Sequence, residues 1–171
     1  MYQAATGEDR RRAHRALAEA LAGSGNTDRE AWHRAFAAEG PDPELVSALE
    51  LVGSRALRRG GYLAALAAYE RASALCSDPA QRAGLTLAAA RGAWACGQAG
   101  KAQALLSAAR EDAADPLLIC DIARLRGHIE VNLGSATEAH RIFVEAAHAV
   151  HPYDPARACL LYTSPSPRDR S

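Results

Sequence analysis

The sequence has few aromatic residues: Phe, Trp and Tyr make up 5% of its 171 residues, although 49% are hydrophobic. Alanine is the main apolar residue. Alanine has the highest intrinsic helix propensity, whereas sheets are rich in β-branched and aromatic side chains. A chain of this length can bury a substantial core, either as one domain or as several stacked units. We therefore expect an all-α protein.

The chain also lacks net charge, a long apolar run and paired cysteines. Its 20 basic and 20 acidic residues cancel, which gives no general attraction to nucleic acid or to an anionic membrane. No apolar run approaches the roughly 20 residues that span a bilayer, and the first residues do not resemble a signal peptide. The four cysteines are scattered singly, at Cys76, Cys96, Cys120 and Cys159. We expect reduced thiols, a cytoplasmic location, and no contact with nucleic acid or membrane.

One spacing pattern occurs three times and gives the chain an internal register. Each copy has a glycine followed by residues five, nine and twelve positions later. The copies are Gly60, Ala65, Tyr69, Ala72; Gly97, Ala102, Leu106, Ala109; and Gly134, Ala139, Phe143, Ala146. The glycines are 37 residues apart, from 60 to 97 and from 97 to 134. A fainter copy starts at Gly23 and matches at Trp32 and Ala35 only. Such self-similarity indicates a repeat architecture in which the pattern residues pack helices together.

A second kind of turn signal alternates with the glycines. Asp-Pro occurs at residues 42–43, 78–79, 115–116 and 154–155. Asp accepts hydrogen bonds from the first free N–H groups of a helix, and Pro has the right φ for its first position. Apolar residues at helical spacing predict helices over 8–22, 26–38, 44–59, 62–75, 80–96, 101–113, 117–133 and 136–150.

These signals divide the chain into four helix-turn-helix units, over about 8–41, 42–77, 78–114 and 115–153. One pair of helices cannot cover both of its apolar stripes, but stacked pairs cover each other. We therefore predict an α-solenoid of antiparallel helix pairs in a helical-repeat region over 1–159.

The glycine-based pattern resembles the second half of the tetratricopeptide repeat motif. Gly53 and Gly127 match the small residue in the first helix of that motif. A narrower resemblance covers residues 14–21, 29–50, 55–83 and 124–148, with strings such as RALRRGGYLAALAAYERASALCSDPAQRA. These look like the helical-repeat region of large ATP-binding LuxR-family transcriptional regulators of actinobacteria. The resemblance implies an ATPase module before this region and a DNA-binding module after it. ATP is expected only in that other module, and no cofactor in this chain.

The last twelve residues, 160–171 (LLYTSPSPRDRS), abandon the alanine-rich pattern. They resemble a translated adaptor or vector scar, and we expect a disordered, non-native tail outside the fold. Met1 is interpreted as an internal start within a longer protein.

Four features invite a binding or catalytic interpretation, and for each a structural role is favoured. Gly97-x-x-Gly100-Lys101 lacks the strand and the Ser or Thr of a P-loop. His148 and His151 have a ligand spacing, but nothing completes a zinc set. The arginines at 10, 11, 12, 15, 58 and 59 form local basic clusters, but acidic residues are interspersed on the helices of the chain, which favours solvated helix faces. Trp32 and Trp94 lie at packing positions.

No Ser-His-Asp or Cys-His arrangement has a recognisable spacing, so we expect no catalytic or metal-binding residue and no enzyme. The favoured hypothesis is a fragment of a LuxR-type regulator whose repeats are a sensor or scaffold. A protein or small effector would then bind on the concave face of the repeats. The alternative is a free-standing tetratricopeptide-like adaptor for protein–protein interaction.

Overall fold

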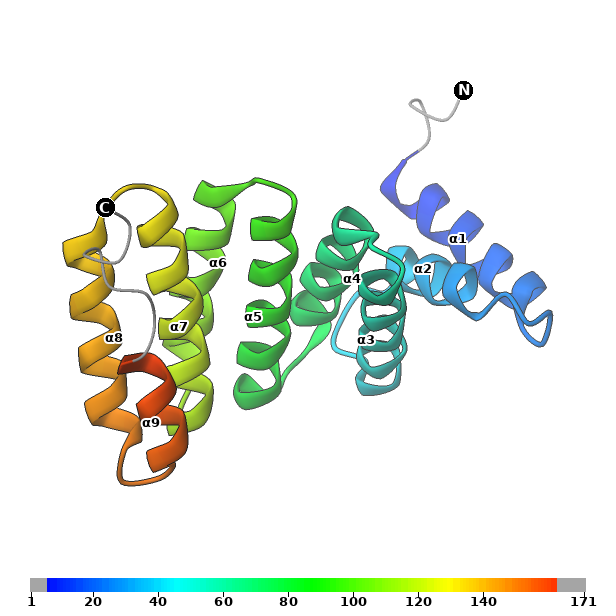
Figure 1. Ribbon diagram of the computed structural model, residues 1–171. Helices are drawn as coiled ribbons and strands as arrows, with labels where there is room; N and C mark the ends of the chain where they lie inside the picture. Colours follow the sequence, from blue (N-terminus) through cyan, green and yellow to red (C-terminus); the bar gives the residue numbers. More distant parts are fainter. Residues whose placement is uncertain (1–5, 163–171) are drawn as a thin grey trace.

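The computed structural model describes residues 6–162, and within them the chain is entirely helices and connecting turns (Figure 1). The all-α prediction is confirmed. The helices are α1 (Gly7–Leu21), α2 (Thr27–Ala37), α3 (Pro43–Arg58), α4 (Tyr62–Leu75), α5 (Pro79–Ala95), α6 (Ala99–Asp112), α7 (Pro116–Asn132), α8 (Ala136–Val150) and α9 (Pro155–Tyr162). None of these helices is long and apolar enough to cross a membrane.

The helices form a stack of antiparallel pairs, with α1 at one end and α8 and α9 at the other (Figure 1). We call the pairs units 1 to 4: α1–α2, α3–α4, α5–α6 and α7–α8. Each helix packs mainly on the helix before it and the helix after it in the chain. The arrangement is that of a helical-repeat solenoid.

In units 2, 3 and 4, the turn between the two helices has the same conformation. Gly60, Gly97 and Gly134 have φ of 74°, 74° and 91°, a conformation that a residue with a Cβ rarely adopts. The residue after each glycine donates its backbone N–H to the carbonyl five positions back, at 2.9 Å in all three turns. These are Schellman turns, which satisfy the last free carbonyls of the first helix.

Between units, Asp-Pro starts the next helix. Asp42, Asp78 and Asp115 accept hydrogen bonds from backbone N–H groups in the first turns of α3, α5 and α7, and Pro follows at the first helical position each time. Asp154 accepts in the same way from the N–H of Arg157 in α9, at 2.9 Å.

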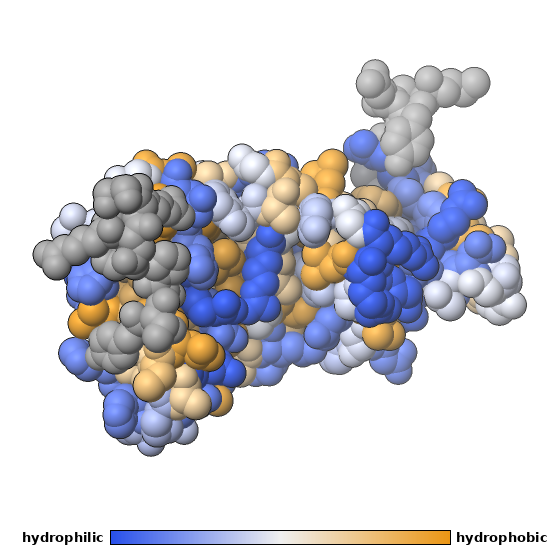
Figure 2. All heavy atoms as spheres, viewed as in Figure 1, coloured by the Kyte–Doolittle hydropathy of each residue, from blue (hydrophilic) through white to orange (hydrophobic). Residues whose placement is uncertain are grey.

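Small residues allow the helices to approach closely. Ala65, Ala72, Ala102 and Ala109 are fully buried. The buried residues form two clusters that meet at α7. The larger runs from α2 to α7, and the smaller joins α7, α8 and α9. Figure 2 shows hydrophilic and hydrophobic residues interspersed over the visible face.

Most helix ends lie within one residue of those expected from the sequence, and two boundaries differ by more. Helix α6 begins at Ala99, two residues before the expected 101, because the Schellman turn needs only Gly97 and Gln98. The expected tail begins at 160, but α9 continues through Tyr162 and Leu161 is only 2% exposed. Leu161 completes the smaller cluster with α8, which accounts for this extension of the fold. The rest of the expected tail, 163–171, lies outside the described residues.

Candidate functional site

The residues of the glycine-based pattern lie in turns or in the core. The three glycines form the turns, and the nine others are between 0% and 7% exposed: Ala65, Tyr69, Ala72, Ala102, Leu106, Ala109, Ala139, Phe143 and Ala146. Their position is therefore one of helix packing.

Glycine in the first helix makes room for an aromatic ring from the second. A Cβ at Gly53 would lie 2.8 Å from the ring of Tyr69, and a Cβ at Gly127 would overlap the ring of Phe143. In unit 3 the equivalent pair, by the interval of 37 residues, is Ala90 and Leu106. Where the first helix has alanine in place of glycine, the second helix has leucine in place of the larger aromatic residue.

The segment Gly97-x-x-Gly100-Lys101 is an ordinary helix-to-helix turn. A helix precedes it, and its N–H groups at 97 and 98 donate to carbonyls of α5. The ammonium of Lys101 lies 2.9 Å from the carboxylate of Glu70. The N–H groups at 97 and 98 and the ammonium of Lys101 thus have partners within the protein.

The remaining sequence candidates are separate from one another. Among residues 6–162, no three His, Cys, Asp or Glu side chains come together in a way that could hold a metal ion. Of the basic residues in α1, Arg11 lies 2.6 Å from Glu39, and Arg12 lies 3.4 Å from Glu8. The ring of Trp32 stacks on that of Phe36, with centroids 5.8 Å apart. Trp94 packs on the larger core cluster.

We use the word seam for the contact between the second helix of one unit and the first helix of the next. The α4–α5 seam is tight: a Cβ at Gly92 would lie 3.2 Å from backbone atoms of Leu66. The hydroxyls of Ser73 and Thr86 are 2.7 Å apart across it. A residue without a side chain thus lets α5 lie directly on α4.

The α6–α7 seam is more open, and α6 and α7 approach each other much less closely than α4 and α5. In the 37-residue register, Gly92 is replaced by Ile129 and Leu66 by Gln103. The side chain of Ile129 is fully buried, and the amide of Gln103 donates to Glu130 at 3.1 Å. Because an isoleucine occupies space that the glycine leaves free, the two helices stand farther apart.

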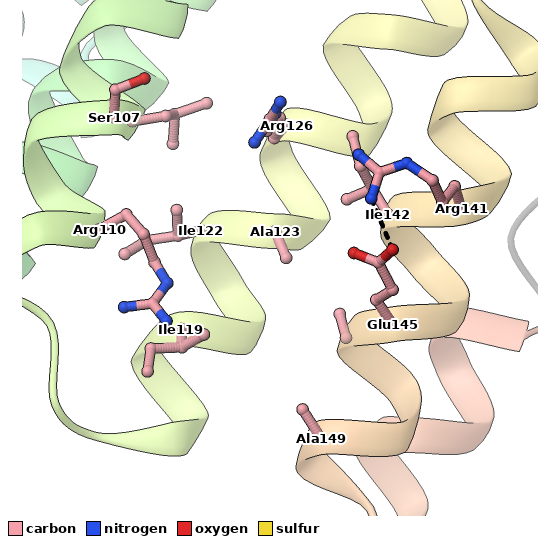
Figure 3. Close-up of a pocket in the computed structure, with 12 residues that line it drawn as sticks. Ser107, Arg110, Ile119, Ile122, Ala123, Arg126, Arg141, Ile142, Glu145 and Ala149 are labelled. Carbon is pink, nitrogen blue, oxygen red and sulfur yellow. Dashed lines mark hydrogen bonds and ion pairs between the residues drawn. The ribbon is translucent and has the colours of Figure 1, made fainter.

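A pocket of about 450 Å³ lies at this open seam, between α6 and α8 and across α7 (Figure 3). Its apolar wall includes Ile119 and Ile122 from α7 and Ile142 from α8. Its charged lining residues are Arg110, Arg126, Arg141 and Glu145. The pocket therefore combines an apolar wall with an excess of positive charge.

Arg141 is neutralised by its neighbours on α8. Its guanidinium donates to both carboxylate oxygens of Glu138, at 2.6 and 2.9 Å, and to Glu145 at 2.5 Å. The hydrogen bond from Arg141 lowers the pKa of Glu138, and both glutamates raise the pKa of Arg141. Arg126 is only loosely paired, since its Nη2 lies 3.8 Å from Glu138.

Arg110 has no ion pair within the described part of the chain. Its Nη1 donates to the backbone carbonyl of Ala113 at 3.4 Å, a long hydrogen bond. Two guanidinium groups with unused donors, Arg110 and Arg126, thus border the same apolar space (Figure 3). This arrangement can bind an anion.

Comparisons with protein-family models, with curated proteins and with solved structures give no match to this chain. Of the pocket residues, Leu106 and Ala146 were singled out from the sequence, but only as packing positions, and none of the charged residues was. Aligning the units at the interval of 37 residues could have found two of them, because Arg110 and Arg126 stand where the preceding unit has Ser73 and Ala89.

Proposed function

We propose that this chain is the sensor or scaffold region of a transcriptional regulator similar to the large ATP-binding LuxR family. In this proposal its repeats bind an effector, and the ATPase and DNA-binding modules lie elsewhere in the parent protein. The observation that carries the proposal is the pocket at the α6–α7 seam, which joins two units of the stack. A ligand bound there would contact α6, α7 and α8 together.

Such a ligand has a physical route to influence distant modules. A ligand shifts an equilibrium only if it binds one arrangement better than another. The α6–α7 seam is loosely packed, so the angle between units 3 and 4 is the degree of freedom that a ligand could bias. The rest of the stack would carry that change along its length.

The alternative, a free-standing protein-binding adaptor, has one observation in its favour. A shallow, mostly apolar surface lies between the start of α4 and the end of α5, with Tyr62 and Leu63 exposed to 44% and 65%. Exposed apolar side chains that lie together favour a protein partner.

The coding sequence on either side of this chain separates the two functions. The regulator predicts a P-loop ATPase module upstream and a helix-turn-helix DNA-binding module downstream in the same reading frame. The adaptor predicts polar capping helices at both ends instead. An intact gene without the two modules would contradict the proposed regulator.

A further inference from the structure

The pocket at the α6–α7 seam carries positive charge that the α4–α5 seam lacks. Moving back by 37 residues replaces Arg110 by Ser73, Arg126 by Ala89 and Arg141 by Ala104. At the closed seam, Ser73 bonds with Thr86 and Ala89 is fully buried. The arginines are therefore not needed to build a unit of this fold, and they occur where the seam is open.

The three arginines differ in what already binds them. Arg141 is held by two glutamates, as described above. Arg126 has a single contact at 3.8 Å and is 54% exposed, and Arg110 has only its long bond to a backbone carbonyl. The unused hydrogen-bonding capacity of the pocket thus belongs to Arg110 and Arg126. Arginine binds carboxylates in a two-pronged geometry that adds both strength and orientation.

We propose that this pocket binds a small organic anion with an apolar body. Its carboxylate is attracted by the positive charge of Arg110 and Arg126, which both line the pocket, and its apolar part packs on Ile119, Ile122 and Ile142. The volume of about 450 Å³ lies within the range of small-molecule sites, roughly 300–1,000 Å³. The inference deepens the proposed function and rests on it only in the claim that the repeats bind an effector.

Octanoate is a suitable probe because it joins a carboxylate to a flexible apolar chain. We would titrate the full chain with octanoate and follow the isoleucine methyl signals by NMR, with affinity measured by calorimetry. Saturable shifts are expected at Ile119, Ile122 and Ile142, with millimolar affinity for so small a ligand. Octanol, which lacks the charge, and inorganic phosphate, which lacks the apolar part, should each bind at least about tenfold more weakly.

Variants locate the anion within the pocket. Arg110→Gln and Arg126→Gln should each weaken octanoate binding by about tenfold, since each removes a charged hydrogen-bond donor. The matched control is Arg58→Gln, an exposed arginine on α3. Circular dichroism would verify that all three variants keep their helix content.

Three results would overturn the inference. They are no saturable shift with octanoate up to about 10 mM, octanol or phosphate binding as well as octanoate, and equal weakening by the Arg58 variant. None of them depends on the neighbouring genes. A negative binding result would therefore disprove the ligand site alone, whereas the neighbouring coding sequence tests the proposed regulator.

Discussion

Residue size is matched across the two helices of a unit. Gly53 faces Tyr69 and Gly127 faces Phe143, while unit 3 has Ala90 and Leu106 at the same positions. Each of these residues is buried in the structure. Interiors are close-packed, so one added methyl group against a buried ring forces a displacement. The glycines in the first helices thus have a packing role despite their low helix propensity.

The variant Gly127→Ala tests this role. Its Cβ would overlap the ring of Phe143, and we expect a loss of about 1–3 kcal/mol in the free energy of unfolding. The control is Gly84→Ala in α5, where a Cβ would meet nothing within 4 Å. That change should be neutral or stabilise by up to about 1 kcal/mol. Urea denaturation measures both.

A second substitution should rescue the first. Adding Phe143→Leu to Gly127→Ala recreates the Ala–Leu combination of unit 3, so the double variant should lose less stability than the sum of the single variants. A coupling of about 0.5–3 kcal/mol is typical of residues in contact. Strictly additive losses would mean that the ring and the glycine do not constrain each other.

At the level of single helices, the sequence predicted the structure well because the start and stop signals are local. Asp-Pro and glycine act through backbone groups within a few residues, and they set both ends of α3, α5 and α7. The two larger differences, at the start of α6 and at the end of α9, have other causes. The first follows from the length of the Schellman turn, and the second from tertiary packing. Helix α9 continues because Leu161 finds a buried place in the smaller cluster, which no local signal at 160–162 indicates.

The two kinds of helix start predict different sensitivities to substitution. Asp115 accepts a hydrogen bond from the N–H of Leu117 at 3.0 Å, whereas Ser135, at the start of α8, makes no side-chain cap. Asp115→Ala should therefore destabilise by about 1 kcal/mol. Ser135→Ala should change stability by less than about 0.5 kcal/mol. Thermal or urea unfolding of the two variants measures the difference, and equal losses would argue against this assignment of caps.

For the whole molecule, the stack could be predicted from the sequence, but the pocket could not. The repeat shows which residues are equivalent, yet the spacing of a seam depends on side chains from two different units. Gly92 and Ile129 are equivalent in sequence and have opposite effects, because one admits the neighbouring backbone and the other excludes it. No motif in the sequence singles out Arg110 and Arg126. Only the open seam brings them to one apolar space.

Unequal seams also predict unequal stability along the stack. In repeat proteins, the free energy of unfolding is close to the sum of the stabilities of the single units and of the interfaces between neighbouring units. A weak interface therefore permits part of the stack to unfold while the rest stays folded. The α6–α7 seam is the loosest contact on the path from α3 to α9. We expect native-state hydrogen exchange to show a partial opening of α7, α8 and α9 at lower free energy than the opening of α4 and α5.

The variant Gly92→Ala turns this expectation into a directional test. Its Cβ would lie 3.2 Å from the backbone of Leu66, so α5 must move away from α4 and the tight seam weakens. Exchange in α4 and α5 should then approach that in α7 and α8, whereas Gly84→Ala, on the same helix, should not reduce the difference. If all slowly exchanging amides of the unmodified protein share one opening free energy, the stack unfolds as a single unit. The α6–α7 seam would then be more open than the others without being less stable, and a ligand in the pocket would have no weaker interface to act on.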